Sequence, residues 1–379
     1  MITAFHDFVA WLPTGLPAYL FLITVVVFVH EMGHFLVARA CGVAVEVFSI
    51  GFGGEIFGWN DRHGTRWRVS WIPFGGYVKF LGDLGVASTP DVSRLGGLSD
   101  MERSHAFPFR PLWQRAAVVA AGPFANFVLA IAIFTVTFLI YGQNLNAPVV
   151  DSVVPGSAAA SAGIHKGDLI QKVDGSPVRD FMDLKQAVTM SAGQPMAIAL
   201  ERDGRMMTVH VTPKIMEMKD PFGGIDRSYA LGITNRIEAS RLTHVSYGPV
   251  EAFGAACGQT WMIVKGTMVY VWQMIAGYAD TSQLRGPLGM ATVSQKVAEI
   301  SFGALVSLIA LLSVSIGLIN LFPIPLLDGG HLLYYAFEAV LGRPLGARVQ
   351  DVGFRVGLAM VLGLMLLVTW NDLVRLNLF

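Results

Sequence analysis

Four stretches of the chain are apolar and long enough to cross a lipid bilayer, which takes about 20 residues of helix. They occupy residues 17–40, 112–141, 302–322 and 354–370. A fifth stretch, residues 250–278, is rich in Trp, Met and Val, but Gln259, Lys265 and several glycines interrupt it. Such a mixture is typical of a helix that lies along a surface. The hydrophobic pattern therefore predicts a polytopic α-helical membrane protein with four transmembrane helices.

Two segments between these stretches have the pattern of β-structure. Residues 45–80 combine β-branched and aromatic side chains with glycines, which predicts a hairpin or small sheet that is unusually apolar for a loop. Residues 82–104 are rich in Gly, Ser and Asp and are typical of a linker. Residues 147–236 contain short strand-like runs, a turn into a short helix, and a hairpin around Asp203-Gly204. We therefore expect a membrane-associated β-hairpin and an inserted α+β domain.

The composition agrees with a membrane protein. Hydrophobic residues make up 53% of the 379 residues and charged residues only 14%, where a soluble domain usually has about 25% charged residues. The formal net charge is +0, so the composition gives no indication of nucleic-acid binding.

The positions of Lys and Arg predict how the chain is oriented. Seven basic residues lie between the first two apolar stretches: Arg62, Arg66, Arg68, Lys79, Arg94, Arg103 and Arg110. Arg343 and Arg348 lie between the last two, and none precedes the first. Because loops rich in Lys and Arg stay in the cytoplasm, both termini and residues 142–301 are expected on the outer side.

Two histidines and a glutamate lie inside the first apolar stretch, in the sequence HEMGH at residues 30–34. His30 and His34 project from the same face of a helix, which suits two imidazole ligands on one zinc ion. Glu31 is then placed to act as general base for the water that zinc activates. Ionisable side chains are costly within a membrane, so they are functional by default there. The alternative is a pair of buried histidines with Glu31 as their counter-ion.

A catalytic zinc site also needs a third protein ligand and an open coordination position. Asp328 is the candidate, because it lies in a segment broken by prolines and glycines, NLFPIPLLDGG at residues 320–330. Such irregular backbone at membrane depth is tolerated only where it is buried in protein or lines a water-filled cavity. The alternative is that Asp328 caps the N-terminus of the helix that follows it.

Together these features resemble the site-2 protease family of intramembrane zinc metalloproteases, specifically its bacterial regulator-of-sigma-E-protease branch. The resemblance covers nearly the whole chain. It rests on HExxH at 30–34, NxxPxPxxDGG at 320–330, AGPxxN at 121–126, Gly286-Pro287, and a PDZ-like segment between the second and third apolar stretches. Two features depart from some relatives. Only one PDZ-like segment fits between the second and third apolar stretches, where some relatives carry two, and Ser315 stands where some carry an asparagine with a longer reach.

The resemblance implies that His30, His34 and Asp328 bind one zinc ion and that Glu31 is the general base. It implies a bacterial inner-membrane enzyme that cuts the transmembrane helix of single-span proteins. An anti-sigma factor, already trimmed outside by another protease, is the expected substrate, and signal-peptide remnants fit as well. The active site is expected toward the cytoplasmic side.

The resemblance also implies how substrate is held. Residues 45–80 look like a membrane-reentrant β element that pairs with an unwound substrate by strand addition. Residues 147–236 look like a circularly permuted PDZ domain on the periplasmic side. Its carboxylate-binding loop corresponds to Leu231, Gly232 and Ile233. Residues expected to position substrate are Asn320, Pro323 and Pro325, although Asn320 is equally explained as an ordinary polar residue at a helix end.

Two other functions stay open at this point. A membrane transporter would use His30, His34 and Asp328 as a transit site for metal, but it would not need Glu31 beside them. A scaffold would act through the PDZ-like segment alone, so changing Glu31 would have no effect.

The segments expected along the chain are the tail and first span (1–44), the β element and linker (45–111), the second span (112–142), the PDZ-like domain (146–237), the surface helix (246–300), the third span with the Pro-rich segment (301–330), and the last loop with the fourth span (331–379).

Overall fold

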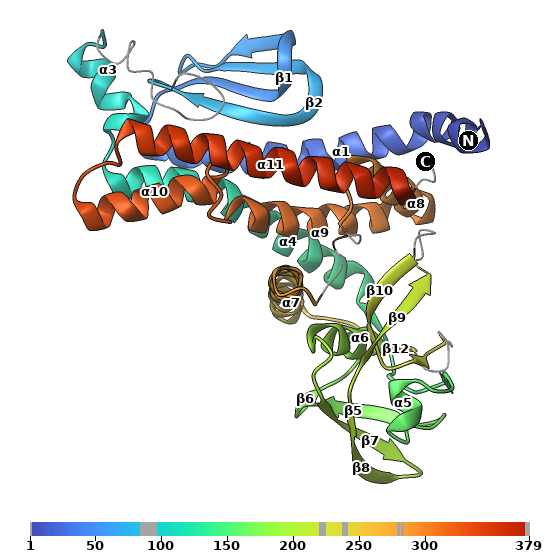
Figure 1. The fold of residues 1–379 in the computed structure, drawn as a ribbon. Helices are drawn as coiled ribbons and strands as arrows, with labels where there is room; N and C mark the ends of the chain where they lie inside the picture. Colours follow the sequence, from blue (N-terminus) through green and yellow to red (C-terminus); the bar gives the residue numbers. More distant parts are fainter. Residues whose placement is uncertain are drawn as a thin grey trace. The chain divides into compact units, whose positions relative to one another are not determined.

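The computed structural model describes residues 2–83, 97–219, 225–236, 242–278, 281 and 284–375 (Figure 1). The chain divides into two compact units, one formed by Met1–Phe134 with Arg285–Phe379 and the other by Thr135–Leu284. Most of the linker expected at 82–104 falls on residues 84–96, outside the described part.

The first unit is built on long apolar helices. Its helices are α1 (Ile2–Ala40), α3 (Asp100–His105), η1 (Phe107–Phe109), α4 (Leu112–Tyr141), α8 (Pro287–Ile300), α9 (Phe302–Asn320), α10 (Asp328–Leu341) and α11 (Ala347–Arg375); the end of α4 belongs to the second unit. Among the described residues, four helical segments are long and apolar enough to span a membrane: Gly15–Ala40, Leu112–Tyr141, Phe302–Asn320 and Arg348–Arg375. The four predicted spans are therefore confirmed, and the last is longer than the sequence pattern suggested.

Helix α1 is the centre of this unit. It packs against α8 and α9, and Leu22 and Val26 on it are completely buried. It also comes very close to α4, because a Cβ atom at Gly33 would collide with the backbone of Ala121. Helix α11 runs antiparallel to α1 (Figure 1) and is tied to α8 by a buried carboxylate. Asp372 accepts hydrogen bonds from the backbone N–H groups of Gly286 (3.0 Å) and Gly289 (2.9 Å), so it caps α8.

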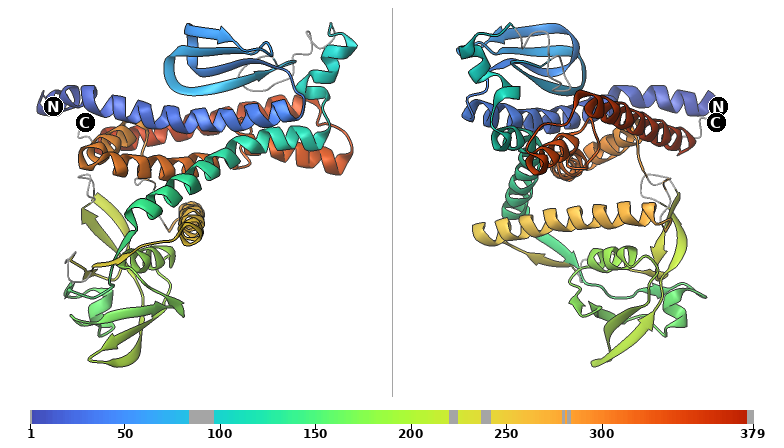
Figure 2. Two further views of the ribbon diagram at one scale, coloured as in Figure 1. Left: turned by 180° about the vertical axis from the view of Figure 1, so that it is seen from behind. Right: turned by 60° about the vertical axis from the view of Figure 1, so that its left-hand side comes forward.

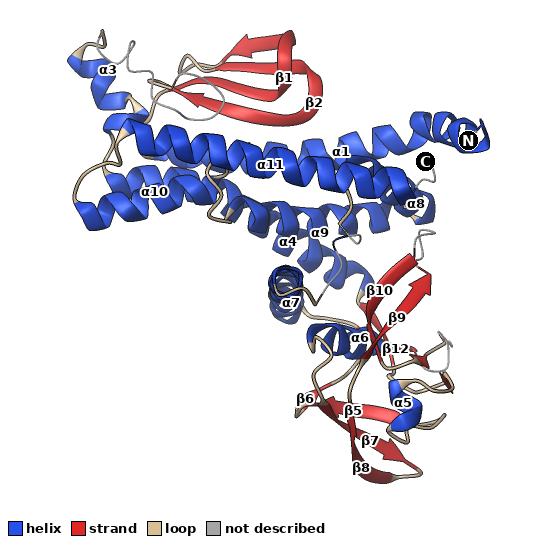
Figure 3. Ribbon diagram, viewed as in Figure 1, coloured by secondary structure: helices blue, strands red, loops and turns tan. Residues whose placement is uncertain are grey.

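The predicted β element is a hairpin of two long, bent strands, β1 (Val45–Asn60) and β2 (Arg66–Phe80), drawn in red in Figure 3. Residues 45–50 of β1 pair on one side with 66–69 of β2 and on the other side with 76–80 of β2. Residues 55–60 pair with the outer side of 66–70. The four stretches therefore lie in the order 55–60, 66–70, 45–50, 76–80, with residues 76–80 at one edge.

One apolar cluster fixes this hairpin to α1, on which it lies in Figure 2. Phe48 of β1 is 1% exposed and packs edge-on against Phe35 of α1, while its ring stacks on Trp67 of β2. Aromatic side chains bury large areas, so these rings supply much of the contact. In contrast, Ile56, Phe57, Trp71, Ile72 and Phe74 at the far end of the hairpin are exposed. An exposed apolar tip is what a membrane-associated element needs.

The second unit is a small α+β domain. Its strands are β3 (Gln143–Asn146), β4 (Ser152–Val153), β5 (Leu169–Val173), β6 (Ser176–Pro177), β7 (Met196–Arg202), β8 (Arg205–Val211), β9 (Lys214–Lys219), β10 (Ile225–Ala230), β11 (Ile233–Thr234) and β12 (Leu242–Val245). Its helices are α5 (Ala158–Ser161), α6 (Phe181–Met190) and α7 (Pro249–Ile275). Strands pair in the order β6-β5-β7-β8, and β3-β12, β4-β11 and β9-β10 form separate antiparallel pairs. The predicted hairpin around Asp203-Gly204 joins β7 and β8.

Helix α7 packs beside α6 (Figure 2), where Gln273 donates to the backbone of Thr189 at 3.0 Å. It is not among the four segments that are apolar enough to span a membrane. Its exposed side chains recur at helical spacing and are apolar: Val250, Phe253, Trp261, Met268, Trp272 and Ile275. This stripe is typical of a helix that lies along a membrane surface, so the interfacial position stays a prediction.

A buried ion pair holds the second unit together. The Asp168 carboxylate is fully buried and receives two hydrogen bonds of 2.7 Å from Arg202 and one of 2.8 Å from the backbone N–H of His165. Burial opposes ionisation of Asp168, but these hydrogen bonds outweigh it, so the pKa of the Asp168 carboxyl lies below its ordinary value.

This shift predicts an acid-sensitive unit. A carboxyl whose pKa is lower in the folded state adds stability above its unfolded pKa of about 3.9, and that stability is lost as pH falls through the folded pKa. We expect Asp168→Asn to destabilise the unit at pH 7 by about 2 kcal/mol and to flatten its loss of stability below about pH 4. Amide hydrogen exchange of β5 and β7 in the solubilised full-length protein measures both effects. Asp203→Asn in the exposed β7–β8 turn is the matched control; an equal effect there would contradict the assignment.

Candidate metal centre

Four residues are predicted to bind zinc or to act as general base, and helix α1 carries three of them on one rigid element. His30 and His34 are buried, at 8% and 9% exposed, and their Nε2 atoms lie 3.2 Å apart. Glu31 lines the same cavity as both rings. Because an α-helix repeats every 3.6 residues, the spacing of four fixes the two rings on one side.

The segment between α9 and α10 brings in the third group. Its backbone is irregular, and Leu326 has a φ of +112°, a conformation that side-chain-bearing residues rarely adopt. Cβ atoms at Gly329 and Gly330 would collide with the carbonyls of the preceding turn, so only glycines fit there. Asp328 is the first residue of α10, and its side chain does not cap that helix. The capping alternative is therefore wrong.

The carboxylate of Asp328 instead faces the two histidines. Its Oδ2 lies 3.1 Å from Nε2 of His30 and 3.5 Å from Nε2 of His34. Four ligands at zinc–ligand distances near 2.0–2.1 Å form a tetrahedron whose edges are about 3.3 Å. The triangle of 3.1, 3.2 and 3.5 Å therefore matches one face of a zinc tetrahedron, and the fourth corner remains for a non-protein ligand.

The backbone of α4 orients the His34 ring. The Nδ1 atom of His34 donates to the Val118 carbonyl at 2.8 Å, which leaves the lone pair on Nε2 toward Asp328. A Cβ atom at Gly122 would collide with the same ring. The glycine of the AGPxxN sequence thus gives His34 its space. His30 has a different partner in α4, since its Nδ1 lies 3.2 Å from Nδ2 of Asn126.

A cavity of about 180 Å³ opens on this cluster. On one side it is lined by Gly76, Tyr77 and Val78, which belong to the edge stretch of β2. A Cβ atom at Gly76 would lie 3.2 Å from Cγ of Glu31, so the β2 backbone runs directly past the glutamate. Among the described residues, the outer side of residues 76–80 has no strand partner.

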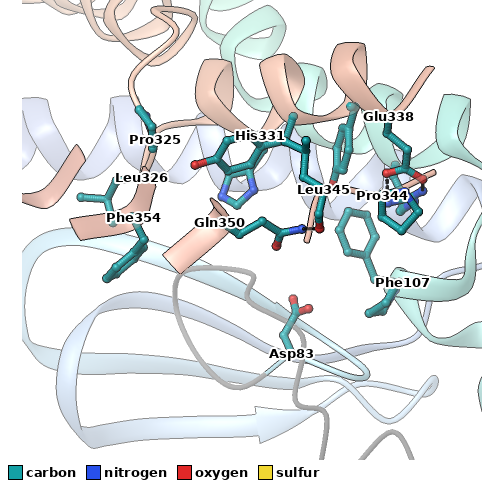
Figure 4. A pocket seen from close by; sticks show the side chains of 14 residues that line it. Asp83, Phe107, Pro325, Leu326, His331, Glu338, Pro344, Leu345, Gln350 and Phe354 are labelled. Atoms are coloured by element: carbon teal, nitrogen blue, oxygen red, sulfur yellow. Dashed lines mark hydrogen bonds and ion pairs between the residues drawn. The ribbon is translucent and has the colours of Figure 1, made fainter. Parts of the chain in front are cut away.

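A second cavity of about 300 Å³ adjoins the first, and both are lined by Leu326 and His331 (Figure 4). Its far wall contains a paired arginine and glutamate, because Arg115 of α4 donates to Glu338 of α10 at 2.6 and 3.2 Å. Aromatic and apolar side chains such as Phe107 and Phe354 complete it. The metal centre therefore lies beside a mixed polar and apolar chamber of the first unit.

The structure brings most of the predicted site residues together. His30, Glu31, His34, Asn320 and Asp328 line one cavity, and Pro325 lines the adjoining one. Pro323 lines neither cavity. Leu231, Gly232 and Ile233 lie in the second unit and line a separate cavity there. Sequence reasoning pointed to His331 as a supporting residue, and it lines this cavity. The same reasoning missed the contact of Asn126 with His30, although Asn126 belongs to the AGPxxN sequence.

Comparison with known proteins identifies the family. The model of peptidase family M50 matches residues 18–364, which is most of the chain. The chain belongs to peptidase family M50. Its HExxH sequence on α1 and its DGG sequence on α10 both lie within the matched region.

Similar curated proteins extend over nearly their whole lengths. A protein of Rhizobium meliloti named as a zinc metalloprotease is 46% identical over 94% of this chain and 96% of its own. Metalloprotease MmpA of Caulobacter vibrioides is 41% identical over 95% of each chain. The regulator of sigma-E protease RseP of Salmonella typhimurium is 31% identical over 96% of this chain and 99% of its own. This M50 peptidase is therefore a zinc metalloprotease, and its four long apolar helices make it a membrane protein.

The contact between Gly122 and His34 gives a test of the metal centre. We expect Gly122→Ala to displace the His34 ring of this M50 peptidase and to lower zinc affinity at least tenfold, since disturbing a ligand's support typically costs 10–100-fold. Gly363→Ala in α11 is the matched control, because a Cβ atom there meets nothing within 4 Å. Zinc content after dialysis against a chelator, measured by elemental analysis, distinguishes the two. Equal zinc retention in both variants would contradict this role of Gly122.

Proposed function

We propose that this M50 peptidase hydrolyses a peptide bond within the transmembrane segment of single-span membrane proteins. The observation that carries the proposal is the convergence of His30, His34 and Asp328 beside Glu31 on a membrane-spanning helix. A metal triad with an adjacent carboxylate suits hydrolysis, and its position on an apolar helix suits a substrate that is itself within the bilayer.

In this proposal His30, His34 and Asp328 hold the zinc ion. When bound, zinc acts as a Lewis acid that lowers the pKa of water and polarises a carbonyl group. Glu31 takes the proton from the attacking water and delivers it to the amine that leaves, as general acid–base chemistry requires. The burial of His30 and His34 strengthens these electrostatic interactions, because the local dielectric around buried groups is lower than that of water.

The edge of the hairpin explains how a helical substrate becomes accessible. The peptide bonds of a helix are shielded by their own hydrogen bonds, so the segment must unwind before it is cut. Residues 76–80 of β2 offer a strand edge that has no strand partner within the described ranges, along the cavity that contains Glu31. Strand addition onto this edge would satisfy the backbone groups of an unwound substrate and hold it extended. Asn320 lines the same cavity and is the proposed positioning residue.

The substrate class follows from this arrangement and from the named relatives. The similarity to the regulator of sigma-E protease supports an anti-sigma factor that another protease has already trimmed, and signal-peptide remnants fit the same chemistry. The basic loops support a bacterial inner-membrane protein with its active site toward the cytoplasm and both termini and the second unit in the periplasm.

Replacing Glu31 tests the reaction. We expect Glu31→Gln to keep zinc but to reduce cleavage of a membrane-embedded reporter by at least a thousandfold, because the base is lost while the ligands remain. Asp328→Asn is the comparison, since it should lose zinc and cleavage together. Both are measured in proteoliposomes by reporter cleavage and by zinc content. Zinc flux through Glu31→Gln, with no cleavage by the wild type, would instead support a transporter.

The second unit has a groove that supports a PDZ-like role. A cavity of about 380 Å³ lies between α6, with Phe181, Leu184 and Val188, and the segment Leu231–Ile233. The carbonyl of Leu231 accepts from the N–H of Ala159 and the carbonyl of Gly232 accepts from Val154, each at 2.8 Å. Because C=O and N–H point in opposite directions across a trans peptide, the N–H groups of Gly232 and Ile233 point away from these partners. We propose that they bind the C-terminal carboxylate of a trimmed substrate.

This groove can be tested with peptides. We expect the full-length protein to bind decapeptides that end in a free leucine carboxylate, and to bind the same peptides at least tenfold more weakly when the C-terminus is amidated. The apolar lining favours leucine over aspartate at the last position. Fluorescence anisotropy measures the affinity for the peptide with a free leucine carboxylate, for its amidated form and for the peptide that ends in aspartate. Equal binding of acid and amide would favour a domain that excludes bulky substrates by size.

A further inference from the structure

Asn126 is a buried polar residue that the proposed reaction does not use. It lies on α4, one turn after Gly122, and is 0% exposed. Its Nδ2 atom lies 3.2 Å from Nδ1 of His30, while its Oδ1 atom is buried without a hydrogen-bond partner among the described residues. A buried amide with an unpaired oxygen is unfavourable unless another state uses that oxygen.

The contact with His30 has a consequence for metal binding. Where the Asn126 amide donates to Nδ1, Nδ1 carries the lone pair and the ring proton sits on Nε2, which faces Asp328 at 3.1 Å. A zinc ion on Nε2 takes the place of that proton. The neutral ring must then carry its proton on Nδ1, where it needs a hydrogen-bond acceptor.

Asn126 can supply that acceptor, because a half-turn about Cβ–Cγ exchanges the positions of its oxygen and nitrogen. We propose that Asn126 is a positioning residue for His30, because its amide oxygen accepts from Nδ1–H and leaves the Nε2 lone pair of His30 facing Asp328. The Val118 carbonyl does the same for His34, since Nδ1 of His34 donates to it.

Helix α9 holds this residue in place. The hydroxyl of Ser313 donates to the backbone carbonyl of Asn126 at 2.8 Å. A Cβ atom at Gly317 of α9 would lie 3.1 Å from Cβ of Asn126, so the two helices approach each other closely here. The side chain of Asn126 is therefore fixed at its base, and rotation of the terminal amide is the remaining adjustment.

The inference rests on the proposed role of His30 as a zinc ligand, and two substitutions separate its amide chemistry from packing. Asn126→Leu keeps the size of the side chain but removes both donor and acceptor. We expect it to weaken zinc binding 10–100-fold in the solubilised full-length protein, measured by competition with a chelator. Asn126→Asp keeps only acceptors, and we expect zinc affinity at or above that of the wild type.

Cobalt substitution gives a second readout. We expect Asn126→Asp loaded with Co²⁺ to keep the intense visible absorption of a tetrahedral site, and Asn126→Leu to lose intensity or shift. Ser313→Ala removes the support from α9 without touching the ring, so it should leave zinc affinity within about twofold.

Three results would overturn the inference: unchanged zinc affinity in Asn126→Leu, loss of zinc in Asn126→Asp, or an equal loss in Ser313→Ala, which would indicate packing alone. His30→Ala separates this from the function itself. If His30→Ala retains zinc, the proposed metal site is wrong. If it loses zinc while Asn126→Leu does not, only the role of Asn126 fails. The Asp variant decides the matter even if the Leu variant does not fold.

Discussion

The distance between three side-chain atoms constrains the rest of the first unit. Two imidazole nitrogens and one carboxylate oxygen must lie about 3.3 Å apart in surroundings that otherwise favour apolar groups, and they come from helices almost three hundred residues apart in the chain. Several unusual local features serve this one requirement. Gly122 leaves space for a ring, two consecutive glycines allow α10 to begin against the preceding turn, and Leu326 adopts a positive φ.

The hairpin is positioned relative to the same cluster of His30, His34 and Asp328. Its aromatic cluster with Phe35 fixes β1 and β2 to α1 at the residue directly after His34. This attachment leaves residues 76–80 at the sheet edge beside Glu31. A strand edge is normally an aggregation risk, and proteins cover or charge such edges. Among the described residues this edge has no strand partner, and under the proposed function it is the place where the substrate chain adds as a strand.

Much of this arrangement could be predicted from the sequence. The four spans are long, continuous apolar runs, and the HExxH pattern needs only the regular repeat of a helix. Asp328 could be predicted because the prolines and glycines around it break the helix at membrane depth. Such irregular backbone is tolerated there only where it is buried in protein or lines a water-filled cavity. The contact of Asn126 with His30 could not, because it depends on how α4 crosses α1 rather than on any local pattern. The doubling of the hairpin into four stretches also depends on bends that the glycine positions suggest but do not specify.

The placement of three functional groups on one helix limits how the site can move. His30, Glu31 and His34 lie on α1, which fixes the positions of their backbones relative to one another. The remaining degree of freedom is the separation between α1 and the segment that carries Asp328. A substrate that widened this gap would separate the Asp328 carboxylate from the two histidines. Under the proposed function, the edge of β2 offers an approach that leaves these three groups where they are, and the same edge would hold the substrate extended.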